Sequence, residues 1–262
     1  GFLIGPIINS GGRLNHSKYS VELLSSNDDK IIKDRANKLI NLNNKRKKIE
    51  QNILDQINFD KIKNENKNVI IYYKKNLNEG LIGIIASRLK DYFDKPSIVI
   101  TKSNNILKAS ARSNLKYNIG NLIKLLIDND IIEKGGGHNM AAGFTLKKEN
   151  LKILDEFIQD DYLKKNKKKY NFNNYDMELS PSSININFMN ELNNLGPFGN
   201  FNFLPTFFIK NVKIIKSEII KNKHVSAIIK PELGSSIKAI SFNCISTKIG
   251  EYLLSYKKKI NI

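Results

Sequence analysis

Cysteine, tryptophan, histidine and long apolar runs are scarce or absent in this sequence. Cys244 is the one cysteine among 262 residues, which excludes disulfide bonds within the chain and favours a reducing, cytoplasmic location. No segment approaches the roughly 18 apolar residues of a membrane span, and we expect no signal peptide. The histidines, His16, His138 and His224, have no aspartate-rich neighbours, so we expect no site for a catalytic metal ion within the chain.

Acidic residues are also in short supply, and arginine is rare among the basic residues. The chain has 43 Lys and Arg against 25 Asp and Glu, a formal net charge of +18, and a globular protein this basic usually binds a polyanion such as nucleic acid. Lysine, asparagine and isoleucine dominate throughout, so part of the charge reflects a general compositional preference. The five arginines are Arg13, Arg35, Arg46, Arg88 and Arg112.

The arginines are informative because a planar guanidinium can bind a phosphate with two hydrogen bonds at once, which lysine cannot do. Arg13, Arg88 and Arg112 lie in stretches rich in glycine, serine or alanine. We assign Arg35 and Arg46 to the exposed surface of a helix. Arg88, inside a predicted helix, is expected to pair with an acid and hold its domain together.

The apolar pattern predicts two compact regions joined by a long helix. Residues 1–26 form an apolar segment, a turn at 9–13 and a short helix, and residues 27–64 form a mostly polar connector helix. Residues 65–165 alternate strands and helices, which indicates a compact α/β domain. Residues 166–262 start with a basic linker and a helix from Ser180, followed by strands at residues 206–215, 224–229 and 237–242 without helices between them. That pattern favours a small β-barrel of the OB-fold type. Both chain ends look cut, so we expect a piece of a longer protein.

Residues 135–143, Gly-Gly-Gly-His-Asn-Met-Ala-Ala-Gly, are the most unusual stretch. Without Cβ atoms, the N–H groups of Gly135, Gly136 and Gly137 can turn toward one point and let an anion approach the main chain. His138 follows directly and can donate or accept a hydrogen bond there. The stretch therefore predicts either a tight phosphate-binding loop or a plain glycine hairpin that the histidine caps.

Two further stretches offer groups that suit a phosphate. Ser110 and Arg112 lie on a predicted strand, where alternating side chains place both on the same side. Asn9 and Arg13 enclose two glycines and present an amide and a guanidinium. Glu79 and Gly80 precede a helix with small residues on one side, and we interpret them as a cap with close helix packing.

Taken together, these motifs resemble the RecJ family, single-strand-specific DNA exonucleases of the DHH phosphoesterase superfamily. The resemblance extends over nearly the whole chain in order and spacing, and Ile7 departs from it because the family usually has arginine there. The matching motifs are at residues 5–6, 9–14, 79–89, 110–113, 135–143 and 195–199.

The resemblance implies a fold and a set of roles. The fold would be the end of a DHH domain, a connector helix, a DHH-associated α/β domain and an incomplete OB-fold-like β-barrel. Ser110 and Arg112 would hold the 5′-end phosphate, His138 would contact the scissile phosphate, and Arg13 would line the same cleft. Mn²⁺ or Mg²⁺ would be bound by residues absent from this chain, which alone would be inactive. Single-stranded DNA would be the main partner, with single-strand-binding protein and a helicase as candidate protein partners.

Two other functions remain open from the sequence. One is a different DHH phosphodiesterase, such as an oligoribonuclease or a cyclic-dinucleotide enzyme, against which the extra β-domain after Lys169 argues. The other is a non-catalytic module that binds single strands. Degradation of a long strand, of a dinucleotide, or of neither would distinguish the three.

Overall fold

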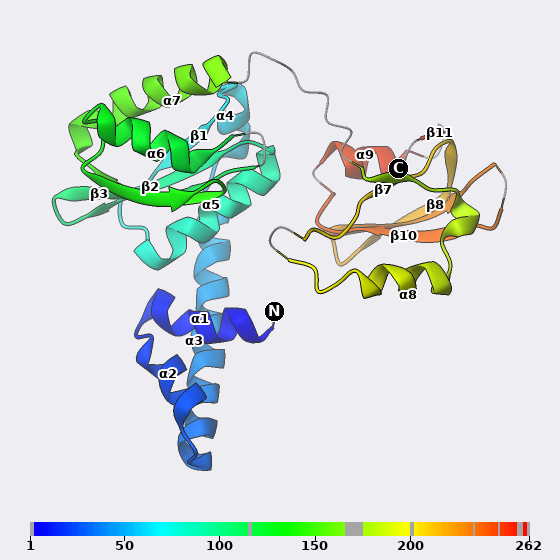
Figure 1. Ribbon diagram of the computed structural model, residues 1–262, viewed down its shortest axis with the longest axis horizontal. Helices are drawn as coiled ribbons and strands as arrows, with labels where there is room; N and C mark the ends of the chain where they lie inside the picture. Colours follow the sequence, from blue (N-terminus) through cyan, green and yellow to red (C-terminus); the bar gives the residue numbers. More distant parts are fainter. Residues whose placement is uncertain are drawn as a thin grey trace. The chain divides into compact units, whose positions relative to one another are not determined.

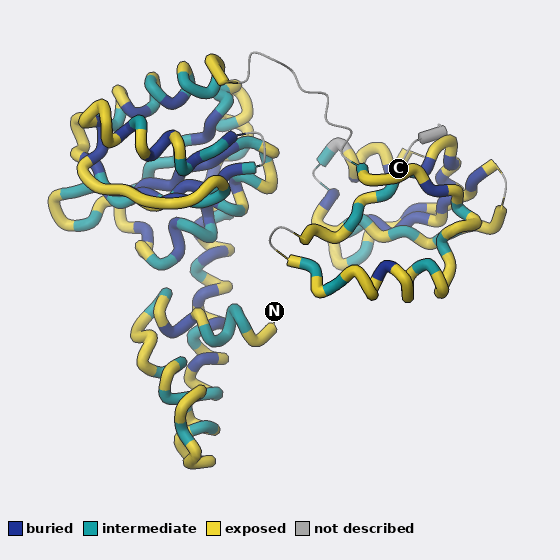
Figure 2. Tube along the Cα trace, in the orientation of Figure 1, coloured by how far each residue is buried: buried dark blue, intermediate teal, exposed yellow. Residues whose placement is uncertain are grey.

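The computed structural model describes residues 3–114, 117–165, 175–199, 202–232, 234–245, 247–255 and 259–260. The chain divides into two compact units, residues 1–169 and 170–262, which we describe separately (Figure 1). Figure 2 shows that buried residues concentrate in the sheets and on the inward sides of the helices.

Unit 1 begins with three helices that pack on one another. Helix α1 (Ile4–Leu14) and helix α2 (Lys18–Ser25) both lie against the long helix α3 (Asp29–Asp55), and a separate short helix, α4 (Phe59–Asn64), follows. The predicted turn at residues 9–13 is wrong, because these residues continue α1. Gly11 explains the difference, since a Cβ atom there would lie 3.1 Å from Leu39 of α3. The glycine allows close helix packing and does not mark a turn.

The rest of unit 1 is a five-stranded sheet with helices on both sides. The strands are β1 (Ile70–Tyr73), β2 (Ser97–Ser103), β3 (Ile106–Arg112), β4 (Lys134–His138) and β5 (Ala141–Leu146), in the spatial order β1-β2-β3-β5-β4. Only the β1–β2 pair is parallel. Helices α6 (Ile119–Asp128) and α7 (Leu151–Lys165) cover one face, and α5 (Glu79–Phe93) lies on the other (Figure 1).

The two faces of the sheet are covered unequally. On the α6 and α7 side, the buried core includes Leu107 of β3 and both Phe144 and Leu146 of β5. On the α5 side, the buried sheet residues are Ile70 and Val99 of β1 and β2, with none from β5 or β4 among the described residues. Helix α5 therefore covers one half of its face and leaves the β5–β4 half open.

The glycine run 135–137 belongs to a strand. Residues Lys134–His138 form β4, the outermost strand, which pairs with β5 through a turn at Asn139 and Met140. The prediction of a tight loop is therefore wrong, and the alternative of a glycine hairpin is confirmed. Three glycines are poor strand formers, so here the pairing with β5 overrides the local preference.

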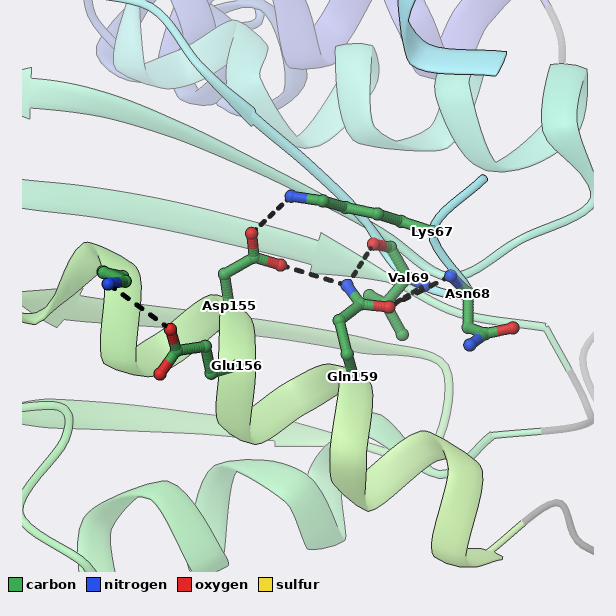
Figure 3. A network of polar contacts seen from close by, with 7 residues as sticks. Lys67, Asn68, Val69, Asp155, Glu156 and Gln159 are labelled. Atoms are coloured by element: carbon green, nitrogen blue, oxygen red, sulfur yellow. Dashed lines mark hydrogen bonds and ion pairs between the residues drawn. The ribbon is translucent and has the colours of Figure 1, made fainter. Parts of the chain in front are cut away.

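At the opposite edge of the sheet, one side chain of α7 binds the backbone just before strand β1. The Gln159 amide accepts hydrogen bonds from the backbone N–H groups of Asn68 and Val69 at 3.0 and 3.2 Å, and it donates to the Val69 carbonyl at 2.8 Å (Figure 3). An ion pair between Lys67 and Asp155 lies beside it. These contacts satisfy backbone groups that an edge strand would leave unpaired.

In its described residues, unit 2 contains two small sheets and three helical segments. Strand β6 (Met177–Glu178) pairs with β7 (Phe207–Phe208), and a four-stranded antiparallel sheet has the order β10-β9-β8-β11. Its strands are β8 (Val212–Ile220), β9 (His224–Lys230), β10 (Ile237–Ser241) and β11 (Lys259–Ile260). The helical segments are a 3₁₀ turn (Pro181–Ser183), α8 (Ile186–Asn194) and α9 (Lys248–Leu254).

Three details of unit 2 differ from the sequence prediction. The helix expected from Ser180 is a 3₁₀ turn followed by α8, and the expected strand at 206–215 is divided between β7 and β8. Helix α9 is not predicted from the sequence, and its Leu253 joins the small core with Val225 and Ile229. Within the described residues the sheets do not close into a barrel. The predicted linker residues 166–169 lie outside the described residues, while Lys164 and Lys165 end α7.

Candidate phosphate-binding groove

A groove with a volume of about 720 Å³ lies over the open half of the sheet. The end of α1 and the start of α5 form its walls, and β3, β5 and β4 form its floor. Its lining includes five of the residues predicted from the sequence: Arg13, Ser110, Arg112, Gly135 and Gly136.

The strand register sets the side chains of the floor in three parallel rows. Arg112, Ala141 and His138 are paired across β3, β5 and β4, and so are Ser110, Gly143 and Gly136. Lys108, Thr145 and Lys134 form the third row. Paired residues place their side chains on the same face of a sheet, and the rows lie about 7 Å apart along the strands. Arg112 and His138 are therefore on one face, about 10 Å apart across two strand spacings.

Arg112 is held at the end of β3 by short contacts. Its Nη1 donates to Ser110 Oγ at 3.1 Å and to the Ala111 carbonyl at 2.8 Å. Gly83 of α5 makes space for these two side chains, because a Cβ atom there would lie 2.8 Å from Arg112 Nη2 and 3.0 Å from Ser110 Oγ. The expectation that Ser110 and Arg112 point to the same side is confirmed.

Arg13 reaches the groove from the last turn of α1. Its Nη1 donates to the Gly80 carbonyl at 3.0 Å, and the Arg13 carbonyl lies 2.2 Å from where a Gly80 Cβ would be. The expected close packing at Gly80 is therefore confirmed. Partial burial lowers the pKa of the Arg13 guanidinium, the charge of Arg46 lowers it further, and Glu50 partly offsets this.

The arginines divide into two groups by whether a carboxylate neutralises them. Arg35 pairs with Glu22 at 2.5 Å, Arg46 with Glu50 at 2.6 Å and Arg88 with Glu50 at 2.8 Å. The expected acid partner of Arg88 is thus confirmed. The assignment of Arg46 to the surface is wrong, because Arg46 is 8% exposed: Glu50 and Asn43 satisfy its guanidinium inside the helix packing.

Arg13 and Arg112 form the second group, and neither has a carboxylate partner in the described part of the chain. Burial lowers the pKa of Arg112, and the positive charge of Arg13 lowers it further. Two half-buried guanidinium groups that repel each other across a groove are most readily stabilised by an anion between them. A phosphate can act as this anion, because its oxygens can accept paired hydrogen bonds from each of the two guanidinium groups.

His138 ends the row that starts at Arg112, and it is exposed. Its Nδ1 accepts a long hydrogen bond of 3.4 Å from the Met140 N–H, which leaves Nε2 to face a ligand. Gly120, at the start of α6, lets the His138 backbone approach, since a Cβ atom there would lie 3.0 Å from the His138 carbonyl carbon. His138 and Gly137 are beside the groove and do not line it.

Three predicted residues do not line the groove, and several residues that line it were missed. Besides Gly137 and His138, Asn9 is exposed on α1 and does not line the groove. The missed residues include Lys134, Gly143 and Lys108, the last of which pairs with Glu79 at 2.6 Å. Lysine is too frequent here for any one to stand out, and the strand register that gathers these residues was hidden by the incorrect loop prediction.

The groove does not offer the ligands of a metal ion. Within the part of the chain that the structure describes, no three His, Cys, Asp or Glu side chains gather as a metal site would require. The groove's carboxylate, Glu79, is engaged by Lys108, and hydrogen bonds from Lys108 and Ser103 lower its pKa. Among the described residues, no helix is both long and apolar enough to cross a membrane.

Comparisons with known families and with curated proteins agree on one family. The DHHA1 domain family matches residues 66–163, and the RecJ OB domain family matches residues 175–262. The single-stranded-DNA-specific exonuclease RecJ of Haemophilus influenzae is 30% identical over 100% of this chain and 48% of its own length. RecJ of Bacillus subtilis is 29% identical over 93% of this chain and 31% of its own length. The chain thus spans less than half of these relatives.

Solved structures give the same fold. RecJ from Thermus thermophilus in complex with Mn²⁺ superposes with a TM-score of 0.69 and 18% identity over 92% of this chain and 38% of its own. An exonuclease RecJ bound to manganese superposes with a TM-score of 0.52 and 23% identity over 62% of this chain and 40% of its own. With a DHHA1 domain followed by a RecJ OB domain, the chain belongs to the RecJ family and corresponds to the carboxyl-terminal portion of RecJ.

Proposed function

We propose that this chain is the strand-holding part of a metal-dependent, single-stranded-DNA-specific exonuclease that works 5′ to 3′ in DNA repair and recombination. The observation that carries the proposal is the pair Arg13 and Arg112, the two arginines without a carboxylate partner in the described residues, in one groove. The relatives named as single-stranded-DNA-specific exonucleases support the choice of ligand.

The predicted site residues have separate roles in this proposal. Arg112 and Ser110 bind the 5′-end phosphate, and Arg13 binds it from the opposite wall. The backbone of residues 135–137, which carries no side chains, lies beside it, and His138 donates from Nε2 to the phosphate at the scissile bond. Preorganised donors of this kind lower the barrier by stabilising charge that develops on the phosphate.

The metal ion belongs to another part of the intact protein in this proposal. The polar side chains of the groove are mainly cations and hydroxyls, and its carboxylate, Glu79, is paired with Lys108. This set does not fit Mn²⁺ or Mg²⁺, whereas RecJ structures have been solved with both ions. We therefore assign no reaction step to a metal on this chain, whose residues position the strand. Proteins that present such a strand, single-strand-binding protein and a helicase, are the proposed partners. We also propose a cytoplasmic location, which the single cysteine favours and which agrees with a DNA substrate.

Binding of a 5′-phosphorylated single-stranded oligodeoxynucleotide to this chain tests the proposal. Arg112→Ala should weaken binding about tenfold, because a charge-assisted hydrogen bond contributes about 1.5–3 kcal/mol. Arg35→Ala, which removes an arginine already paired with Glu22, is the matched control and should bind like the wild type. The wild type should cut nothing with Mn²⁺ added. Equal affinities for both variants, or cleavage by the chain alone, would contradict the proposal.

The intact protein distinguishes this function from that of another DHH phosphodiesterase. It should degrade a long 5′-phosphorylated strand in preference to a dinucleotide, and Arg112→Ala should slow that degradation without lowering the melting temperature. Faster turnover of the dinucleotide would favour the oligoribonuclease or cyclic-dinucleotide alternative.

A further inference from the structure

We propose that the groove has a second phosphate subsite, formed by Lys134 of β4 and reached across the bare backbone at Gly136 and Gly143. This inference rests on the proposed function and deepens it. It names the residues that hold the strand beyond the phosphate bound at Arg112.

Lys134 carries the free positive charge at the far end of the floor. Its row lies four residues along the strands from the row of Arg112, a distance of about 14 Å. Lys108 in the same row is already neutralised by Glu79, whereas Lys134 is exposed, lines the groove and has no ion-pair partner among the described residues. An anionic strand that leaves the Arg112 site along the floor therefore meets Lys134 next.

The middle row keeps the path between the two cations clear. A Cβ atom at Gly136 would meet nothing within 4 Å, and one at Gly143 would lie 3.7 Å from the Ala109 carbonyl, an ordinary contact. Neither glycine has a positive φ. The fold would therefore accept alanine at both positions, and the missing side chains leave space above the floor for a ligand.

The neighbouring glycines provide the contrast. A Cβ atom at Gly137 would lie 2.4 Å from the Ala141 carbonyl oxygen, and one at Gly135 would lie 2.9 Å from Ile123 in the core. Packing therefore requires glycine at residues 135 and 137, on the side of α6. Packing does not require it at residue 136, on the side of the groove.

Salt-dependent binding of a 5′-phosphorylated single-stranded oligodeoxynucleotide to the full chain tests the subsite. Lys134→Ala should weaken binding about tenfold at low salt and reduce the slope of log affinity against log salt by about 0.7, the value for one single-strand phosphate contact. Lys124→Ala is the matched control, because Lys124 is an exposed lysine on α6, over the opposite face. It should leave both affinity and slope unchanged.

Gly136→Ala tests the clear path separately. It should lower affinity about tenfold at every salt concentration, keep the wild-type slope, and keep or raise the melting temperature, because alanine is compatible with this backbone. Wild-type affinity in both Lys134→Ala and Gly136→Ala, with weakened binding in Arg112→Ala, would overturn the second subsite and leave the proposed function standing. Absence of binding by the wild type would instead overturn the proposed function.

Discussion

At the scale of single residues, the ionic partner of each arginine separates structural from functional roles. Glu50 accepts from Arg46 and Arg88 and so ties α3 to α5. Arg13 and Arg112 have no such partner in the described residues and are left for a ligand. Removal of an arginine that is paired with Glu50 should therefore lower stability. Removal of Arg13 or Arg112 should instead lower ligand affinity.

Glu50→Gln should destabilise unit 1 by about 3 kcal/mol, because it leaves the buried guanidinium of Arg46 without its counter-charge. Denaturant unfolding followed by circular dichroism measures the change. Glu22→Gln is the matched control, since Glu22 pairs with Arg35 at the surface, where ion pairs contribute little. An equal loss of stability in both variants would show that burial of the Glu50 cluster has no effect.

Glu79 should contribute to stability only where it is ionised. Hydrogen bonds from Lys108 and Ser103 lower its pKa in the folded chain, so its contribution is present above the pKa of the unfolded chain and is lost as pH falls through the folded value. The melting temperature of the wild type should exceed that of Glu79→Gln at pH 7. The gap should close as the pH falls below the usual range of glutamate.

Glu133→Gln serves as the control for this experiment. The Glu133 carboxylate is exposed and has no ion-pair partner among the described residues, so its melting temperature should follow the wild type at both pH values. A gap between wild type and Glu79→Gln that widens in acid would reverse the sign of the expected effect.

At the scale of elements, the sequence predicted strands and helices with clear periodicity and failed where glycine had two interpretations. Helices α5 and α6 and strands β1 to β3 follow their apolar patterns. The sequence predicts a turn at residues 9–13 and leaves residues 135–137 open between a tight loop and a glycine hairpin, because glycine is common in all of these. In the structure, Gly11 allows close packing in α1, and Gly135 and Gly137 allow it in β4, a tertiary requirement that no local pattern reveals.

Gly80→Ala should separate α1 from α5. The added Cβ atom would lie 2.2 Å from the Arg13 carbonyl oxygen, and overpacking of this kind destabilises by about 1–3 kcal/mol. Because Arg13 is displaced with α1, binding of the 5′-phosphorylated oligonucleotide should weaken too. Thermal unfolding and binding of the same variant provide the two measurements.

Gly12→Ala is the helical control for stability. A Cβ atom at Gly12 would lie 3.7 Å from the Ser17 side chain, an ordinary contact, so alanine should keep the stability of α1 or raise it by up to about 1 kcal/mol through its helix propensity. Unchanged stability and affinity in Gly80→Ala would contradict this prediction, because they would show that the contact between α1 and α5 accommodates the added Cβ atom.

At the scale of the whole molecule, the candidate site belongs to unit 1. The two buried clusters of residues 1–169 contain no residue of 170–262, and unit 2 has a smaller core of its own. The sequence predicted that Ser110 and Arg112 point to the same side, because side-chain alternation along a strand is local. It could not predict which row of the sheet Lys134 joins, because that depends on a register across three strands.

A fragment of residues 1–169 should fold on its own and bind the 5′-phosphorylated oligonucleotide in a way that depends on Arg112. Its own clusters supply the buried apolar contacts that a domain needs. Circular dichroism should show one cooperative thermal transition, and Arg112→Ala in the fragment should lose affinity by the same factor as in the whole chain. A fragment that is unfolded, or whose binding ignores Arg112, would place the site elsewhere.

The half-covered sheet also restricts how strand β4 can change over evolutionary time. A larger residue at 135 or 137 would collide with the protein's own interior, and one at 136 would occupy the channel that the ligand is proposed to use. The β-branched residues that are common in strands are therefore excluded at residues 135 and 137 by the protein interior and at residue 136 by the proposed ligand. Selection would keep this weak strand former glycine-rich even though a more stable strand is one substitution away.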